Sequence, residues 1–342
     1  MRAGDAAIAF VAECAAMRTA SGATRLFGLT LACAAVAVAM DGGSILGSGR
    51  NTAQPIFRTG VELVRVSLSV QDVSRARPLP ALAPGDFVVQ EDGVPQVIDH
   101  VSHEPQALSL CIALDVSGSM VGRRRELAAE AARTVFSVME PEDEVALVVF
   151  AQDAMVPLRW ASPAAVPGLD WAQWVMKDDT AIYDGVRAAL RLMDTARHAQ
   201  RAVLVISDGE ERASTQPLES LVTTRLQSEA QVFGFLADPA TAVRGRFPKD
   251  LAEHLLRPPP QDLGTVVGDS GGVVYSIADS DRIVAATLAL VSDLRGQFTL
   301  SYRPVKPMDG SYRRLRISAV DRNLRVRHRG GYLASPAPEV RR

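Results

Sequence analysis

Oxygen-bearing side chains stand at the ends of predicted strands in the middle of this 342-residue chain. Asp115, Ser117 and Ser119 follow the apolar run 108–114, so alternate residues of one short loop carry a carboxylate and two hydroxyls. These hard oxygen ligands suit Mg²⁺, Mn²⁺ or Ca²⁺ better than Zn²⁺. The spacing lets the three side chains converge on one cation. By itself, Asp-x-Ser-x-Ser is a weak signal because it often occurs by chance.

Two further segments strengthen this interpretation. Thr180 opens a segment that leads into a helical pattern at 182–193, and Asp208 follows the apolar run 202–206. In an open α/β sheet, ligands bind at the carboxyl ends of the strands, so we expect both residues at the same sheet edge as Asp115. The predicted site for a divalent cation comprises Asp115, Ser117, Ser119, Thr180 and Asp208.

The elements that must position this site alternate along residues 105–295. Apolar runs of strand length occupy 108–114, 145–150, 202–206, 232–236 and 273–277. Amphipathic helices are predicted over 124–139 and 182–193, where apolar residues recur at helical spacing. Continuous apolar strands separated by helices indicate a mostly parallel sheet covered on both faces. The fold class is therefore α/β, with a doubly wound, Rossmann-like domain.

Two β regions flank this domain. In 57–104, apolar and polar residues alternate from Val64 to Val70, and Asp92-Gly93 between apolar segments predicts a hairpin. Residues 296–335 show a three-strand antiparallel pattern. Each set is too small to fold well alone, so we expect the two to form one sheet together. Residues 336–342 are expected to be a loose tail.

The N-terminus has the order of a secretory signal. Residues 26–40 carry no charge, follow Arg18 and Arg25, and end in small residues that fit a cleavage site. Fifteen residues is short for a membrane-spanning helix, which needs about 20, although an uncleaved anchor is the alternative. Met17 is an alternative start. The predicted order is a signal peptide at 1–40 and a flexible linker at 41–56, and the predicted location is secreted, periplasmic or in the cell envelope.

Composition excludes several functions. The net charge of −2 gives no overall positive potential that would attract nucleic acid, and an aromatic content of 5% argues against a surface on which bases stack. Five His and three Cys are too few for a Cys/His zinc module. After signal cleavage only Cys111 remains, which we predict to be a core residue. His-Glu-x-x-His and Gly-x-Ser-x-Gly motifs are both absent from the sequence, so we do not expect an enzyme.

The three segments, in this order, resemble the metal-ion-dependent adhesion site of the von Willebrand factor A domain family. Residues 86–96 and 325–332 resemble the acidobacterial-type VWFA-related family of exported bacterial proteins, and this resemblance covers about 57–335. It implies that the five residues hold a divalent cation, Mg²⁺ first. Thr180 would coordinate directly when ligand is bound, and Asp208 directly or through water. The implied partner is a protein whose Asp or Glu fills the open position.

One departure from the family concerns the residues before Thr180, where Gly is usual and Lys177-Asp178-Asp179 stands here. Asp179 could add a ligand or repel an acidic partner. The favoured interpretation is that Asp178, Asp179, Glu210 and Glu211 face solvent. For residues 123–125 a solvated helix start is favoured over a partner contact, and for the three Trp residues packing is favoured over a partner surface. The insertion at 238–264 could lie at the edge of the site and help to select the partner, or it could be a loop on the surface; the sequence favours neither alternative.

Three functions follow from the sequence. The first is metal-dependent protein binding in adhesion or assembly. The second is a structural subunit in which the metal only stabilises the fold, and the third, least favoured, is a metal-dependent hydrolase. The membrane is expected to contact only an uncleaved N-terminal segment.

Overall fold

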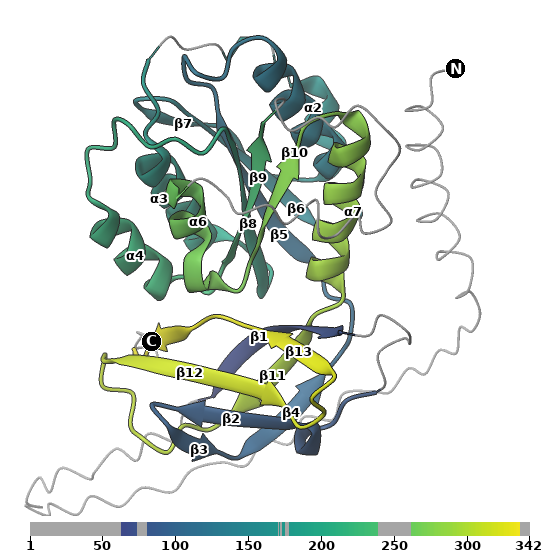
Figure 1. The fold of residues 1–342 in the computed structure, drawn as a ribbon, viewed down its shortest axis with the longest axis vertical. Coiled ribbons are helices and arrows are strands. Elements are labelled where there is room, and N and C mark those ends of the chain that lie inside the picture. The colour runs from purple at the N-terminus through teal and green to yellow at the C-terminus, as the bar shows by residue number, and fades with distance from the viewer. Residues whose placement is uncertain are drawn as a thin grey trace, which may run out of the picture.

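The computed structural model describes residues 63–73, 81–169, 171, 173–174, 178–238 and 261–335 (Figure 1). The predicted signal peptide, linker and tail, and residues 239–260 of the insertion, lie outside these ranges. Within them, no helix has both the length and the apolar character needed to span a bilayer. The chain forms an α/β domain and, beside it, a two-sheet β region (Figure 1).

The α/β domain is built on a six-stranded sheet of order β10-β9-β8-β5-β6-β7, in which only β7 is antiparallel. Its strands are β5 (Leu108–Asp115), β6 (Glu144–Phe150), β7 (Ala154–Ala161), β8 (Gln200–Ser207), β9 (Gln231–Ala237) and β10 (Val274–Ile277). The predicted doubly wound fold is confirmed. β7 was not predicted: it is an edge strand without buried residues, and Pro157 and Arg159 interrupt its apolar residues.

Helices cover both faces of this sheet. The α-helices are α2 (Arg123–Ser137), α3 (Ile182–Leu192), α4 (Leu218–Gln227), α6 (Gln261–Val267) and α7 (Ser280–Arg295). Short 3-10 turns occur at η1 (Pro84–Asp86), η2 (Pro163–Gly168), η3 (Met193–Thr195) and η5 (Gly268–Ser270). α2 and α7 pack on one face, and α3, α4 and α6 pack on the other.

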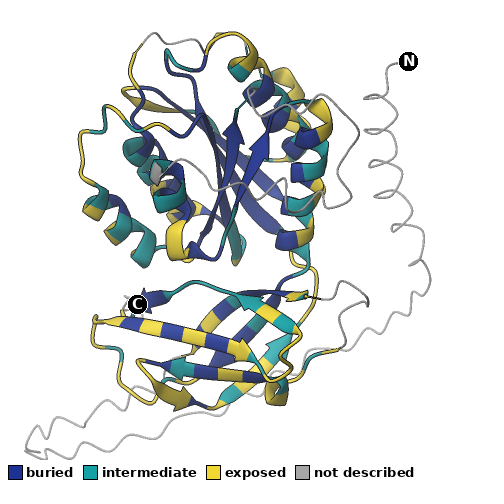
Figure 2. Cartoon of the chain, viewed as in Figure 1, coloured by how far each residue is buried: buried dark blue, intermediate teal, exposed yellow. Residues whose placement is uncertain are grey.

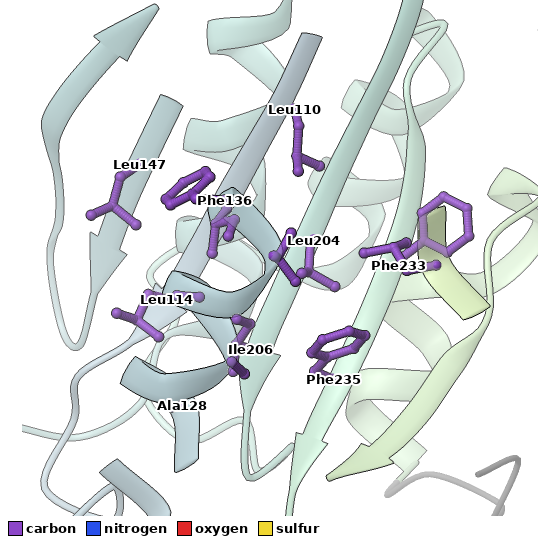
Figure 3. Packing of buried hydrophobic residues seen from close by; sticks show 14 of the residues in the cluster. Leu110, Leu114, Ala128, Phe136, Leu147, Leu204, Ile206, Phe233 and Phe235 are labelled. Carbon is purple, nitrogen blue, oxygen red and sulfur yellow. The ribbon is translucent and has the colours of Figure 1, made fainter. Parts of the chain in front are cut away.

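Alternate residues of one strand enter opposite cores. Leu110 and Leu114 belong to the same buried cluster as Phe136 of α2 and Leu204 of β8 (Figure 3). Cys111 points to the α3 face and is fully buried, as predicted, and burial raises the pKa of its thiol. The parallel strands contain nearly continuous apolar runs because both faces of the sheet are covered, which is why their positions could be predicted.

The β region is a sandwich of two four-stranded sheets, β13-β1-β11-β4 and β14-β12-β2-β3. Its N-terminal strands are β1 (Val64–Asp72), β2 (Phe87–Glu91), β3 (Val94–Gln96) and β4 (Ile98–Ser102). Its C-terminal strands are β11 (Phe298–Tyr302), β12 (Tyr312–Ala319), β13 (Leu324–Arg327) and β14 (Gly331–Leu333). The hairpin at Asp92-Gly93 joins β2 to β3 with φ of 49° and 83°, as a two-residue turn of this kind requires.

The expected single sheet is wrong, whereas the three predicted C-terminal strands are present as β11, β12 and β13 and are followed by a fourth, β14. β11 and β13 both pair with β1, while β12 pairs with β2, so C-terminal strands pair with N-terminal ones. Apolar and polar residues alternate along β12, and the buried stripe is visible in Figure 2. Two stacked sheets cover such one-sided strands with each other, which a single sheet cannot do.

A buried carboxylate joins the two domains. Asp293 of α7 accepts hydrogen bonds from Ser69 Oγ at 3.2 Å and from the Tyr275 hydroxyl. Arg327 of β13 lies 2.8 Å from the same carboxylate and also donates from Nε to the Gly271 carbonyl at 2.8 Å. Asp293 thus binds one group of the α/β domain and two of the sandwich.

We expect Asp293→Ala to lower the free energy of unfolding by about 3–5 kcal/mol, because it leaves Arg327 without its buried counter-charge. Urea unfolding followed by circular dichroism measures the loss. Asp194→Ala, at an exposed position in η3, is the control and should change stability by less than about 0.5 kcal/mol. Equal effects of the two substitutions would show that the junction does not depend on this carboxylate.

Candidate metal centre

The predicted site residues lie at the carboxyl edge of the central sheet. From β5 the chain passes through α2 to β6 on one side, and from β7 it passes through α3 to β8 on the other. The loops therefore diverge between β5 and β8, which is where open α/β sheets form a crevice. Ser117 and Ser119 follow β5, Asp208 follows β8, and Thr180 precedes α3.

The three predicted hydroxyls form a close triangle. Thr180 Oγ1 donates to Ser117 Oγ at 2.8 Å, and Ser117 Oγ lies 3.2 Å from Ser119 Oγ. The third side, from Ser119 Oγ to Thr180 Oγ1, is 3.5 Å. Ser117 and Thr180 are buried, so the triangle is a built feature of the loops rather than a surface coincidence.

Backbone hydrogen bonds hold the loop segments against each other. Gly118 N–H donates to the Asp178 carbonyl at 2.9 Å, which ties the loop after β5 to the segment before Thr180. The Thr180 carbonyl accepts from Arg212 and Ala213 N–H at 2.8 and 3.0 Å. The three segments that sequence reasoning selected are therefore directly connected.

Asp115 is 1% exposed at the end of the central strand. Its Oδ1 accepts the Ser117 N–H at 3.0 Å, and its Oδ2 accepts the Ser207 hydroxyl at 2.6 Å. Burial raises the pKa of Asp115 to about 6, the hydrogen bonds from Ser117 and Ser207 oppose that rise, and the charge of Asp208 adds to it. The site thus holds a negative charge that lacks a full counter-charge.

Ser207 is a site residue that the sequence analysis missed. Its hydroxyl accepts the Gly209 N–H at 3.0 Å while it donates to Asp115, so it links the two carboxylate-bearing loops. The available signal was a polar residue at the end of an otherwise continuous apolar strand.

Asp208 is 8% exposed and contacts a guanidinium. Arg124 Nη1 lies 3.3 Å from Asp208 Oδ2 and 3.4 Å from the Ser119 carbonyl. The prediction that residues 123–125 are a solvated helix start is therefore wrong for Arg124. It holds for Arg123, which pairs with Glu126 at an exposed position.

The other acidic residues near the site divide into two groups. Asp178, Asp179 and Glu210 are exposed, as predicted, and Glu210 pairs with Arg212. Glu211 is half-buried, which corrects its predicted place in solvent: it accepts from Tyr183 N–H at 3.1 Å and Ser214 N–H at 2.8 Å. Glu211 therefore fixes the start of α3 and adds no free carboxylate to the rim.

The tryptophans pack, as favoured. Trp174 is buried and meets Trp171 edge to face at 5.6 Å between ring centroids, and Trp171 in turn lies 6.4 Å from Phe136 of α2. Trp160 in β7 donates from Nε1 to Thr195 Oγ1 at 2.9 Å.

The donor set fits a hard divalent cation. It combines two buried carboxylates with three hydroxyls, and the only guanidinium contact described for Asp208 comes from a partly exposed Arg124. Oxygen ligands of this kind suit Mg²⁺, Mn²⁺ or Ca²⁺. Over the described ranges, no group of three or more His, Cys, Asp or Glu residues is placed to hold a metal, so a site of the zinc type is not found there.

Residues 110–211, which contain all five predicted ligands, match the von Willebrand factor type A domain family. The chain contains a von Willebrand factor type A domain. No curated protein sequence matches the chain. The acidobacterial-type subfamily stays a prediction.

Solved structures similar to the chain share little sequence with it. An aerotolerance-related membrane protein from Bacteroides fragilis is 20% identical, with 55% of this chain and 98% of that one covered, at a TM-score of 0.38. A von Willebrand factor type A protein from Catenulispora acidiphila is 15% identical, with 82% and 74% covered, at 0.44. The PilB minor pilin from Streptococcus sanguinis is 9% identical, with 57% and 63% covered, at 0.41.

We expect Asp115→Asn to stabilise the metal-free A domain above pH 6 and not at pH 4. Because the pKa of Asp115 is raised in the folded state, ionisation of its carboxyl group destabilises the fold. This loss of stability is complete above about pH 6 and disappears as the pH falls to the pKa of Asp115 in the unfolded chain. The shift corresponds to about 3 kcal/mol. Urea unfolding in EDTA at pH 7.5, 6 and 4 measures the difference from the native chain. A difference that is constant with pH would show that the buried carboxylate ionises without cost.

Proposed function

We propose that the chain is a metal-dependent protein-binding module of the cell envelope, serving adhesion or assembly. The observation that supports this most is that Asp115, Ser117, Ser119, Thr180 and Asp208 lie in adjoining loops at one edge of the A-domain sheet. These residues would hold a divalent cation, Mg²⁺ first and Mn²⁺ or Ca²⁺ as alternatives. An Asp or Glu of a protein partner would complete the site.

The residues of the site favour an anionic partner group over a neutral one. Asp115 and Asp208 neutralise the charge of a divalent ion, while hydroxyls are weak donors, so the bound ion would supply an electrophilic position. A carboxylate oxygen is the natural ligand for a hard cation with an open position. The exposed Asp178 and Asp179 lie beside Thr180 and would disfavour partners with several acidic residues.

The A-domain family supports a protein-interaction module, and residues 1–40 support export. A structural role is the second candidate, because hydrogen bonds from Ser117 and Ser207 already satisfy Asp115 within the fold. Hydrolysis is not proposed: the described histidines are His100, His103 and His328 in or beside the sandwich, and His198, which precedes β8 at the opposite sheet edge.

We expect Mg²⁺, Mn²⁺ or Ca²⁺ to raise the melting temperature of the native chain relative to EDTA, because a ligand bound only by the folded state stabilises it. At 100 times the dissociation constant the gain is about 2.7 kcal/mol. Asp115→Asn should remove the effect, while the exposed Asp194→Asn should keep it. Equal shifts in native and Asp115→Asn proteins would place any metal binding elsewhere.

Partner binding separates the adhesive from the structural role. Immobilised chain should retain an envelope protein in Mg²⁺ and release it in EDTA. Thr180→Ala, which removes one predicted ligand without adding charge, should retain less. A structural role predicts that the variant and EDTA lower stability and leave retention unchanged.

We expect Arg124→Gln to tighten metal binding about three- to tenfold, because its guanidinium contacts Asp208 and repels an incoming cation. Isothermal titration with Mg²⁺ or Mn²⁺ gives the dissociation constants. Arg123→Gln, which removes a neighbouring charge that pairs with Glu126, is the matched control. Weaker binding by Arg124→Gln would mean that Arg124 positions Asp208 for the metal rather than competing with it.

A further inference from the structure

A cavity of about 630 Å³ lies between the A domain and the sandwich. One wall is the face of the β1, β11 and β4 sheet that turns away from the sandwich core. The opposite wall includes Gln200 and Gln231, which are the first residues of β8 and β9. These strand starts lie at the other edge of the sheet from the metal centre, a separation of about 25 Å along an eight-residue strand.

Short hydroxyl side chains make this sheet face hollow. Residues alternate across a strand, so Val66, Leu68 and Leu300 fill the sandwich core, while Ser67 and Thr299 line the cavity. Ser301 and Ser102 line it as well. A polar face with small side chains leaves room for a ligand and offers it hydrogen bonds.

Two buried polar atoms at this cavity have no hydrogen-bond partner in the described parts of the chain, Gln297 Oε1 and Arg329 Nε. Gln297 is 7% exposed, and its Nε2 donates to Gln231 Oε1, so the amide is fixed. The Arg329 guanidinium donates from Nη2 to the Arg65 carbonyl at 2.9 Å and lies over the Tyr332 ring at 5.3 Å. Buried polar groups nearly always have a hydrogen-bond partner. Gln297 Oε1 is therefore an acceptor, and Arg329 Nε a donor, to which a ligand could hydrogen-bond.

The arginines that line the cavity differ in whether they have an acidic partner. Arg303 pairs with Asp99 at 3.1 Å, and Arg295 pairs with the buried Asp143. Over the described residues, Arg65 and Arg329 form no ion pair within 4.0 Å, although Glu229 lies close enough to Arg329 to interact electrostatically. The end of the cavity that holds Arg65 and Arg329 is therefore the place for a carboxylate.

We propose that this cavity binds the C-terminal end of a peptide chain, with the carboxylate at Arg329 and Arg65 and a backbone N–H at Gln297 Oε1. A guanidinium is the natural partner of a carboxylate, and the free amide oxygen requires a hydrogen-bond donor such as the backbone N–H of a peptide. The volume is within the range of small-ligand pockets, enough for a few residues. The peptide is either a free fragment or the terminus of a protein.

Such a ligand would connect the two domains. Glu104 and Gln106 line the cavity from the segment that enters the A domain, and Gln297 lines it from the segment that leaves. A peptide bound between Arg329 and Gln297 would touch both the sandwich and this exit segment, and so would hold their relative orientation.

Titration of the full chain with triglycine and with triglycine amide, both in EDTA, tests the proposal. Triglycine should bind, and the amide, which lacks the carboxylate, should bind at least about tenfold more weakly, since a charge-assisted hydrogen bond is lost. Binding of the amide as tight as that of triglycine, or no binding of triglycine, would overturn the proposal. Triglycine placed at the C-terminus of a carrier protein distinguishes a protein terminus from a free fragment.

Three variants test whether the ligand binds in this cavity. Arg65→Gln changes an exposed position and should weaken triglycine binding, and Ser67→Phe should block it by filling the cavity. Arg316→Gln removes an exposed arginine on the other sheet and should leave binding unchanged. Binding that survives Ser67→Phe, or that responds equally to Arg65→Gln and Arg316→Gln, would refute the site.

Discussion

A carboxylate buried at the end of the central strand constrains the rest of the A domain. An ionised group shielded from water is costly unless hydrogen bonds or an opposite charge offset it, and Asp115 is almost fully buried. Its two oxygens accept bonds from the loop that follows it and from the neighbouring strand, so those loops must approach one another. The second carboxylate, Asp208, adds negative charge beside these loops and forms an ion pair with Arg124.

The sequence was most informative where both faces of an element are buried. The parallel strands of the A domain contain nearly continuous apolar runs, and their carboxyl ends must share one edge, so Asp115, Thr180 and Asp208 could be placed together from the sequence. Ser207 was missed, and Arg124 was assigned to a solvated helix start, because their roles depend on proximity in space; Arg124 and Asp208 are 84 residues apart.

In the sandwich, the sequence predicts the strands but not how they pair. Alternation along β1 and β12 reveals which side chains are buried, but it does not say which strand lies alongside, because any one-sided strand satisfies the same pattern. The pairing of β1 with both β11 and β13 depends on contacts between segments more than 220 positions apart. β7 is a related case, since its residues are partly exposed and Pro157 and Arg159 interrupt its apolar run.

The order of strands also sets how the molecule carries tension. Over the described residues, the chain runs through the sandwich from β1 to β4, crosses the A domain, and returns to the sandwich from β11 to β14. A pulling force applied at Leu63 and Ser335 is carried across the sandwich by the ladders between N- and C-terminal strands. The A domain lies outside this load path, so it would bear the force only after those ladders separate.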